Sequence, residues 1–259
     1  MSDRLPGTLS ELPTGLLLAL ETSGKEGSIA LGEWRGNRGG SGSQESPGSV
    51  RLLAQTRLRD EDEHAALLTP AVDEVLAEAG ARPSDLVALV VGAGPGSFTG
   101  VRVAAATAKG MAWSLSLPLW AFSSLAGAAV AAEGEPNRSR VVLFDARGER
   151  LYAAAYRLAR GRLETLLEPV ATDVGRILDS HLSPHGILMG SGALRHKALF
   201  EAAGASVLQP PAGDPDAEGL LRLLALSPDT PPVEDVGAWE PDYLREAGAE
   251  RIRKARKER

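Results

Sequence analysis

The chain has 259 residues, enough for one large domain or two small ones, and its 43% hydrophobic and 24% charged residues are ordinary for a globular protein. The absence of cysteine excludes disulfides, thiolate metal ligands and a cysteine nucleophile, and a net charge of −6 argues against a general nucleic-acid binder. No apolar run approaches the roughly 20 residues that cross a membrane, and the N-terminal sequence lacks the apolar stretch of a secretory signal, so we expect a cytoplasmic protein.

The first half predicts three strands, after which helices alternate with strands. Hydrophobic runs predict strands at residues 16–20, 27–34, 50–57, 86–91 and 119–122. Apolar positions at a helical period predict helices at 62–79, 99–115 and 123–132. Residues 35–49 are rich in Gly and Ser and predict a flexible hairpin tip.

The second half repeats this order. Strands are predicted at 140–144, 149–158, 163–170, 186–189 and 206–208, and helices at 173–180, 193–203 and 216–226. We therefore expect an α/β protein with a duplicated actin-like, ribonuclease-H-like fold, in which each lobe has a mixed five-stranded sheet flanked by helices. The predicted first lobe covers 1–133 and is completed by about 214–259, and the smaller second lobe covers 134–213.

Two turns test whether this fold carries phosphate chemistry. The layout resembles the actin, Hsp70 and sugar-kinase superfamily, in which an acid ends the first strand of each lobe and Gly with Ser or Thr then grips phosphate. The matching turns here are Glu21-Thr22-Ser23-Gly24 and Asp145-Ala146-Arg147-Gly148, and the second lacks the paired Gly and Thr. We expect at most vestigial ligand contacts there, from Glu21, Thr22, Ser23, Gly94, Gly96, Ser97 and Asp145, with polar turns without chemistry as the alternative.

The loop VVGAGPGSFTGVR at residues 90–102 looks like a phosphate loop but fails the known spacings. No two glycines have the Walker spacing, no lysine follows, and Ser97 stands where the dinucleotide fingerprint needs its third glycine. The glycines then serve tight backbone geometry, and Ser97 or Thr99 is expected to cap the helix that follows.

The histidines predict no metal site. The four are His64, His181, His185 and His196, and no pair has helical four-residue spacing without an intervening proline. No catalytic residue is predicted.

Four stretches resemble the TsaB family over nearly the whole chain: LLLALETS, HAALLTPAVDEVLAEAG, LVALVVGAGPGSFTGVRVAAATAKGMAWSLSLPLWAFSSLAGAA and PDYLREAGAE. The resemblance implies a non-catalytic subunit that pairs, through first-lobe helices, with the catalytic subunit TsaD. TsaD transfers threonylcarbamoyl from its adenylate to N6 of adenosine 37 in tRNA. In TsaD two histidines four apart bind metal on the helix that corresponds to 62–79, whereas this chain has His64 and Leu68. Glu21 also departs from the family, in which Asp is usual.

The resemblance also implies partners. These are TsaD, the ATPase TsaE, and tRNA, either indirectly or through the basic tail at 251–259, which is otherwise a solvated helix end. No cofactor is expected in the isolated subunit, and a nucleotide at the partner interface stays an open alternative.

The helix over 99–115 carries small residues every four positions, at Gly100, Ala104, Ala108 and Ala112. We expect a partner interface on this helix and its neighbour, and a charge at Ala105 or Leu68 is expected to abolish the heterodimer and leave the fold intact. Packing on the protein's own sheet is the alternative, and the same surface can close a homodimer when the chain is isolated. The expected interface residues are His64, Leu67, Leu68, Val72, Val75, Gly100, Val101, Arg102, Ala104, Ala105, Ala108 and Lys109.

Two enzyme hypotheses stay open beside the binding subunit. One is an ATP-dependent small-molecule kinase or ATPase of the same superfamily, and the other is a metallopeptidase-like protein.

Overall fold

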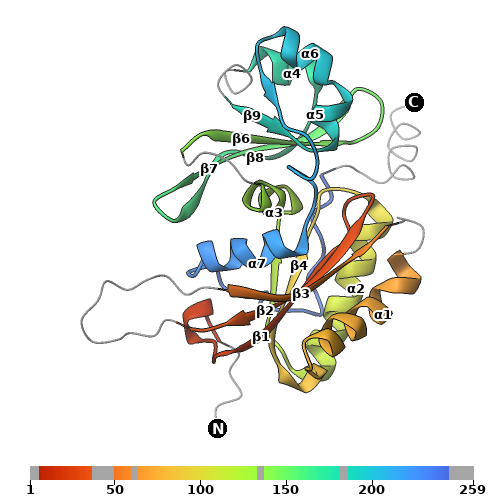
Figure 1. Cartoon of the computed structure of the whole chain (residues 1–259), viewed down its shortest axis with the longest axis vertical. Coiled ribbons are helices and arrows are strands. Elements are labelled where there is room, and N and C mark those ends of the chain that lie inside the picture. The colour runs from red at the N-terminus through yellow and green to blue at the C-terminus, as the bar shows by residue number, and fades with distance from the viewer. Residues whose placement is uncertain (1–5, 37–49, 60–63, 133–136, 181–185, 245–259) are drawn as a thin grey trace.

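Two α/β lobes lie one above the other along the longest axis of the computed structural model (Figure 1), which describes residues 6–36, 50–59, 64–132, 137–180 and 186–244. The first lobe contains a short 3-10 helix at Leu9–Glu11, then β1 (Gly15–Glu21), β2 (Gly27–Trp34), β3 (Val50–Leu58), α1 (His64–Glu78), a 3-10 turn at Pro83–Asp85, β4 (Leu86–Gly92), α2 (Phe98–Leu115), β5 (Leu119–Phe122) and α3 (Ser124–Ala131). The second contains β6 (Ser139–Asp145), β7 (Arg150–Ala159), β8 (Arg162–Asp173), α4 (Val174–Asp179), β9 (Ile187–Met189), α5 (Ser191–Arg195), α6 (Lys197–Ala202) and β10 (Ser206–Val207), followed by α7 (Ala217–Leu226).

The two sheets in the described part of the chain have the same topology. Their strand orders are β3-β2-β1-β4-β5 and β8-β7-β6-β9-β10. In each, the first strand pairs antiparallel with the second and parallel with the fourth. The predicted duplicated fold with two mixed five-stranded sheets is therefore confirmed.

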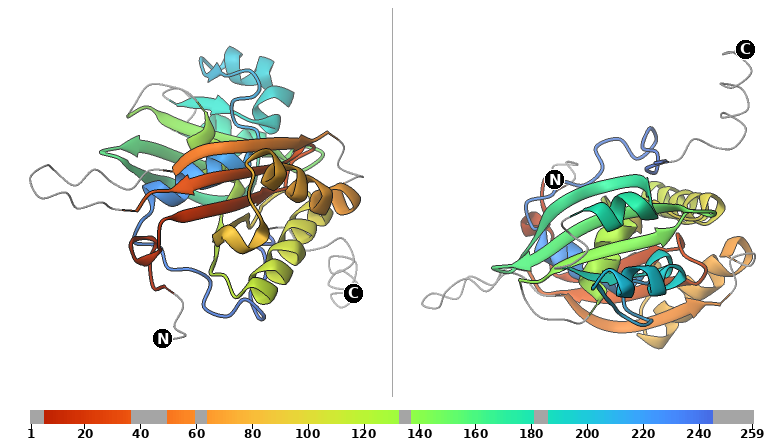
Figure 2. Two further views of the ribbon diagram at one scale, coloured as in Figure 1. Left: turned by 60° about the horizontal axis from the view of Figure 1, so that its bottom comes forward. Right: turned by 90° about the horizontal axis from the view of Figure 1, so that it is seen from above.

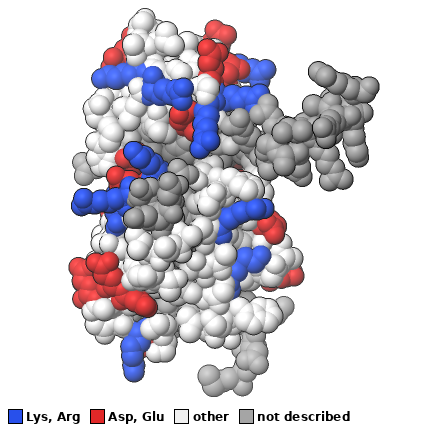
Figure 3. Space-filling view, turned by 90° about the vertical axis from the view of Figure 1, so that its right-hand side faces the viewer, with Lys and Arg blue, Asp and Glu red and all other residues white. Residues whose placement is uncertain are grey.

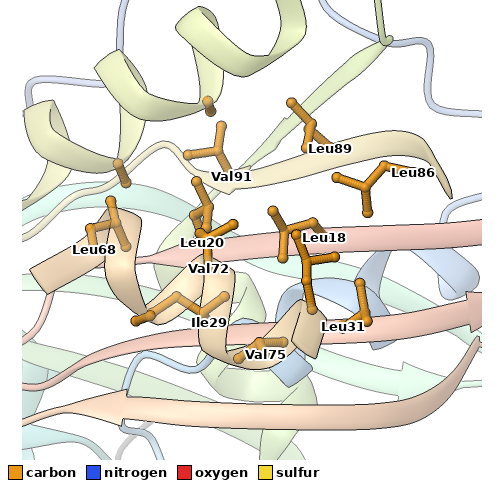
Figure 4. Packing of buried hydrophobic residues seen from close by; sticks show 14 of the residues in the cluster. Leu18, Leu20, Ile29, Leu31, Leu68, Val72, Val75, Leu86, Leu89 and Val91 are labelled. Carbon is orange, nitrogen blue, oxygen red and sulfur yellow. The ribbon is translucent and has the colours of Figure 1, made fainter. Parts of the chain in front are cut away.

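Helices cover both faces of the first sheet, which explains why its central strands are apolar throughout. Leu18 and Leu20 of β1 point to the face that α1 and α2 cover (Figure 4), whereas Leu17 and Ala19 point to the face that α7 covers. Adjacent residues of a strand face opposite sides, so one run of leucines serves two core layers.

The second sheet is covered by α3 on one face and by α4, α5 and α6 on the other. Helix α3 precedes this sheet in the chain, and α7 follows it but packs on the first sheet. The two helices pack together between the sheets (Figures 1 and 2). Their contact is close, because a Cβ on Gly219 would collide with the carbonyl oxygen of Gly127. Helix α3 therefore packs against the second sheet, although it belongs to the first lobe in chain order, as in the predicted boundary.

The chain returns along the first lobe after α7. We call residues 233–244 the C-terminal strap. The N–H of Val233 donates to the carbonyl of Leu119 at 2.7 Å, and that of Asp242 to the carbonyl of Ala93 at 2.9 Å. Trp239 packs on the first-lobe core, whereas Leu244 packs on the core of the second lobe. The strap therefore contacts both lobes.

Three local expectations need correction or fall outside the structure. The helix expected over 193–203 is two helices, because His196 leaves the helical conformation with φ −110° and ψ 21°. Ser123 precedes α3 as expected, but its side chain makes no capping hydrogen bond. The expected Gly/Ser tip at 35–49 and basic tail at 251–259 fall mostly or wholly outside the described residues. No helix among those described is long and apolar enough to cross a membrane.

Candidate functional site

The glycine-rich loop ends with a helix cap. Ser97 is the N-cap of α2, and its Oγ accepts a hydrogen bond from the N–H of Gly100 at 3.2 Å. Of the two hydroxyls expected to cap the helix, Ser97 does so. Side-chain capping of this kind satisfies an N–H that the helix itself leaves unpaired.

Close backbone packing fixes where α2 begins. A Cβ on Gly100 would collide with the carbonyl oxygen of Thr22, and the Thr22 hydroxyl donates to the carbonyl of Gly100 at 2.6 Å. Gly94 has φ +91°, a conformation that favours glycine. These contacts dock the start of α2 against the end of β1, and the glycines are what allow the two backbones to come so close.

A cleft of about 1010 Å³ lies between the lobes. Of the predicted ligand contacts, Ser23, Gly96, Ser97 and Asp145 line it, whereas Glu21, Thr22 and Gly94 do not. The strap contributes Asp242, Tyr243 and Leu244 to its wall. Four acidic and three basic side chains line the cleft, namely Glu26, Asp145, Asp214 and Asp242 with Lys25, Arg57 and Arg147. This balance does not favour a polyphosphate.

Both acids that end the first strand of a lobe are already occupied or shielded. Burial is the largest cause that raises the pKa of Glu21, and the N–H of Ser23 donates to its Oε1 at 2.8 Å. Asp145 accepts from the N–H of Arg147 at 2.9 Å and pairs with the Arg195 guanidinium at 2.6 Å. Glu21 is thus buried away from the cleft, and Asp145 lines the cleft but is paired with Arg195. The described residues contain no group of three His, Cys, Asp or Glu side chains that could hold a metal ion.

The structure places most of the predicted interface residues in the protein's own core. Nine of the twelve are buried within the chain itself: His64, Leu68, Val72, Val75, Gly100, Val101, Ala104, Ala105 and Ala108. The stripe of small residues on α2 therefore lets the helix lie close to its own sheet. Leu68 and Ala105 are both buried, so we now expect a charge at either position to destabilise the first lobe, contrary to the expectation that the fold stays intact.

The opposite face of α2 is exposed to solvent. Trp113 is 78% exposed, and Arg102, Ala106 and Gly110 are exposed on the same helical face. On α1, Leu67 and the small residue Ala66 are also exposed. Figure 3 shows the face over α1 and α2, with uncharged surface at its centre and charged side chains toward its margins.

The predicted interface set omits Phe98, Trp113 and Tyr243, which are the exposed aromatic residues of this region. The exposure of Trp113 could have been predicted from the sequence, because Trp113 lies on α2 opposite the small residues. A helix that packs one face on a sheet exposes the other face. Tyr243 could not be predicted in this way, since no sequence pattern indicates that the strap returns to α2.

The duplicated topology and the cleft between two lobes define an α/β protein of the actin-like, ribonuclease-H-like class. The family model described as tRNA N6-adenosine threonylcarbamoyltransferase (TsaD) matches residues 54–207, more than half of the chain. The chain belongs to this family.

Several of its curated relatives carry the name TsaB, which confirms the sequence resemblance. The tRNA threonylcarbamoyladenosine biosynthesis protein TsaB of Bacillus subtilis (strain 168) is 39% identical over 105 residues, 40% of this chain and 45% of the relative. TsaB of Haemophilus influenzae is 37% identical over 137 residues, 52% of this chain and 51% of the relative. The chain thus spans about half the length of these relatives.

A solved structure supports the fold over a longer range. The crystal structure of an uncharacterized Pseudomonas aeruginosa protein with similarity to peptidase YeaZ superposes with a TM-score of 0.69 and 27% identity. The superposition covers 89% of this chain and 100% of the Pseudomonas aeruginosa chain.

Proposed function

We propose that this chain is a non-catalytic subunit that forms a heterodimer with TsaD for threonylcarbamoyl transfer to N6 of adenosine 37 in tRNA. The TsaB relatives support the pathway. The observation that supports the binding role is Trp113, a tryptophan 78% exposed on a helix whose other face is buried in its own lobe. Exposed tryptophan is characteristic of the centre of a protein interface. TsaE and tRNA join the heterodimer in this proposal.

The burial of Glu21 and the pairing of Asp145 support a scaffold in preference to a phosphotransferase. A kinase needs both lobe turns to hold a phosphate and its metal, whereas Asp145 is paired with Arg195. Nothing in the described cleft favours the kinase or the metallopeptidase hypothesis.

The test is binding to the TsaD of the same organism. We expect a one-to-one complex by light scattering, and loss of the modified nucleoside from tRNA when this chain is deleted from cells. Trp113→Ala should weaken the complex by about thirtyfold, the loss of roughly 2 kcal/mol that is typical of an interface hot spot.

Leu199→Ala is the matched control, because Leu199 is also an exposed hydrophobic residue, 54% exposed, but lies on α6 of the second lobe. Its affinity for TsaD should equal that of the wild type. Equal weakening by both variants, or no complex with the wild type, would contradict the proposal.

A further inference from the structure

An arginine at the start of α2 lies over the ring of Phe98 and beside that of Tyr243, and both rings are exposed. The guanidinium of Arg102 lies 4.1 Å from the ring centroid of Phe98 and 5.6 Å from that of Tyr243. Its Nε donates a hydrogen bond to the Tyr243 hydroxyl at 3.1 Å. The two rings are 5.4 Å apart and tilted by 46°. We call these three residues the Arg102 clamp.

The clamp restricts the position of a cation. No carboxylate among the described residues forms an ion pair with Arg102, and its side chain stays exposed. The stacking and the printed hydrogen bond involve the ring faces and Nε, and not the two terminal nitrogens. Those two nitrogens form the fork that binds a carboxylate with two parallel hydrogen bonds. Because the rings already restrict its rotamers, less conformational entropy is lost when the fork binds.

Lys109 on the same helix has a different role. Its Nζ donates to the carbonyls of Gly237 at 2.9 Å and Trp239 at 2.8 Å. This lysine is therefore committed to the protein's own strap, and Arg102 is the cation that α2 presents outward.

The exposed face of α2 continues from Arg102 through small, uncharged residues to Trp113. Ala106 and Gly110 lie between them on the same face, and both are exposed. Eleven residues of α-helix separate the arginine from the tryptophan by about 16 Å. A second helix can therefore lie along α2 between these two large side chains.

We propose that Arg102 binds a carboxylate on a helix of the partner subunit, and that the same helix helps to form an apolar pocket for Trp113 about 16 Å away. This inference rests on the proposed function, and it specifies the chemistry of the partner. A single fixed guanidinium beside an uncharged helical face suits a protein carboxylate. Nucleic acid would need several cations arranged along one surface, and the second cation of this helix is occupied by the strap.

Tyr243 is a positioning residue in this scheme, because it belongs to the strap and orients Arg102 through its ring and hydroxyl. Through Tyr243 the strap would therefore influence the affinity for the partner.

The experiment measures the affinity of the full chain for TsaD with Arg102 changed conservatively. Arg102→Lys keeps the charge but removes the planar fork, and we expect at least about tenfold weaker binding. Arg102→Ala should bind TsaD at least as weakly as Arg102→Lys. Arg176→Ala is the control, because Arg176 is a similarly exposed arginine on α4 of the second lobe, and its affinity should stay within about twofold of the wild type. The melting temperature of free Arg102→Lys should match that of the wild type.

A charge exchange tests the partner chemistry. Arg102→Glu should abolish binding, and one Asp→Arg or Glu→Arg change in a surface helix of TsaD should restore it. If Arg102→Lys binds as tightly as the wild type while Trp113→Ala is weakened, the heterodimer stands and the carboxylate assignment is wrong. If Arg102→Lys instead weakens tRNA binding by the free chain and leaves the heterodimer unchanged, the ligand is a phosphate and the proposal is overturned. If the wild type does not bind TsaD, the proposed function itself fails.

Discussion

Glu21 is a fully buried carboxyl at the end of β1, with one oxygen bonded to the N–H of Ser23. Its other oxygen lies against Gly92, where a Cβ would collide with it. Sequence reasoning found the position because an acid ends the first strand in both halves. It could not determine that the carboxyl faces inward, since an acid at a strand end is compatible with either orientation.

Glu21→Gln should change how stability depends on pH. Burial raises the pKa of Glu21 above 4.5, so the folded state holds this proton more tightly than the unfolded state. The stabilisation from that proton is complete below the unfolded pKa and is lost as pH rises through the folded pKa. Glutamine carries no such charge, so the melting temperature of the variant relative to wild type should increase between about pH 5 and about pH 8.

Glu33→Gln provides the control of opposite sign. Hydrogen bonds from Arg35 and Arg51 lower the pKa of Glu33, so its contribution is present at high pH and is lost as pH falls. The melting temperature of Glu33→Gln should therefore not exceed that of the wild type at about pH 8. Melting temperatures of Glu21→Gln and wild type that stay parallel across this range would contradict a raised pKa.

Helix α2 shows what an element's sequence can and cannot specify. Its boundaries follow from the glycines before it and the helical period within it, and the structure begins it one residue earlier than predicted. The sequence left open which neighbour its small residues meet, because small residues favour close approach of any neighbour, whether sheet or partner helix, and in the structure Ala104 and Ala108 pack in the first-lobe core. The large residue Trp113 decides between them, since it cannot fit where Ala104 and Ala108 meet the sheet.

The helices α3 and α7 depend on two glycines that allow close contact. Gly219→Ala should destabilise the protein by about 1–3 kcal/mol, because its Cβ would overlap the backbone of Gly127 and the helices would have to separate. The free energy of unfolding in urea measures this loss.

Gly110→Ala is the matched control, since Gly110 is also inside a helix but nothing lies within 4 Å of an added Cβ. Alanine there should stabilise the protein by up to about 1 kcal/mol through helix propensity. Equal effects of the two substitutions would rule out a contact-specific role for Gly219.

The whole molecule was predictable as a duplication, because β-β-β-α-β-α-β-α occurs twice in the order of elements. How the helices pack on the two sheets was less predictable. Hydrophobic periodicity shows that a helix has a buried face, but not which sheet it covers, so the packing of α3 on the second sheet has no local signal. Residues 233–244 were predicted only to help complete the first lobe, and because they have no regular period their sequence does not indicate that they contact α2.

Lys109→Ala tests how the strap is held across the two lobes. The Lys109 ammonium bonds two strap carbonyls, so its loss should increase hydrogen exchange at residues 237–243. Exchange in β1 and β4 should be unchanged, because both hydrogen bonds of the ammonium go to the strap and the buried face of α2 is kept. Mass spectrometry of peptides measures both regions, and faster exchange throughout the chain would indicate general destabilisation instead.

The exchange of helices between lobes also determines the order in which the protein can fold during synthesis. One face of the first sheet is covered by α7, whose residues are made only after the entire second lobe. Until residue 226 leaves the ribosome, Leu17, Trp34 and Trp120 have no helix above them. The lobe translated first therefore cannot be completed first, and a nascent chain arrested before α7 would present an apolar sheet face to chaperones.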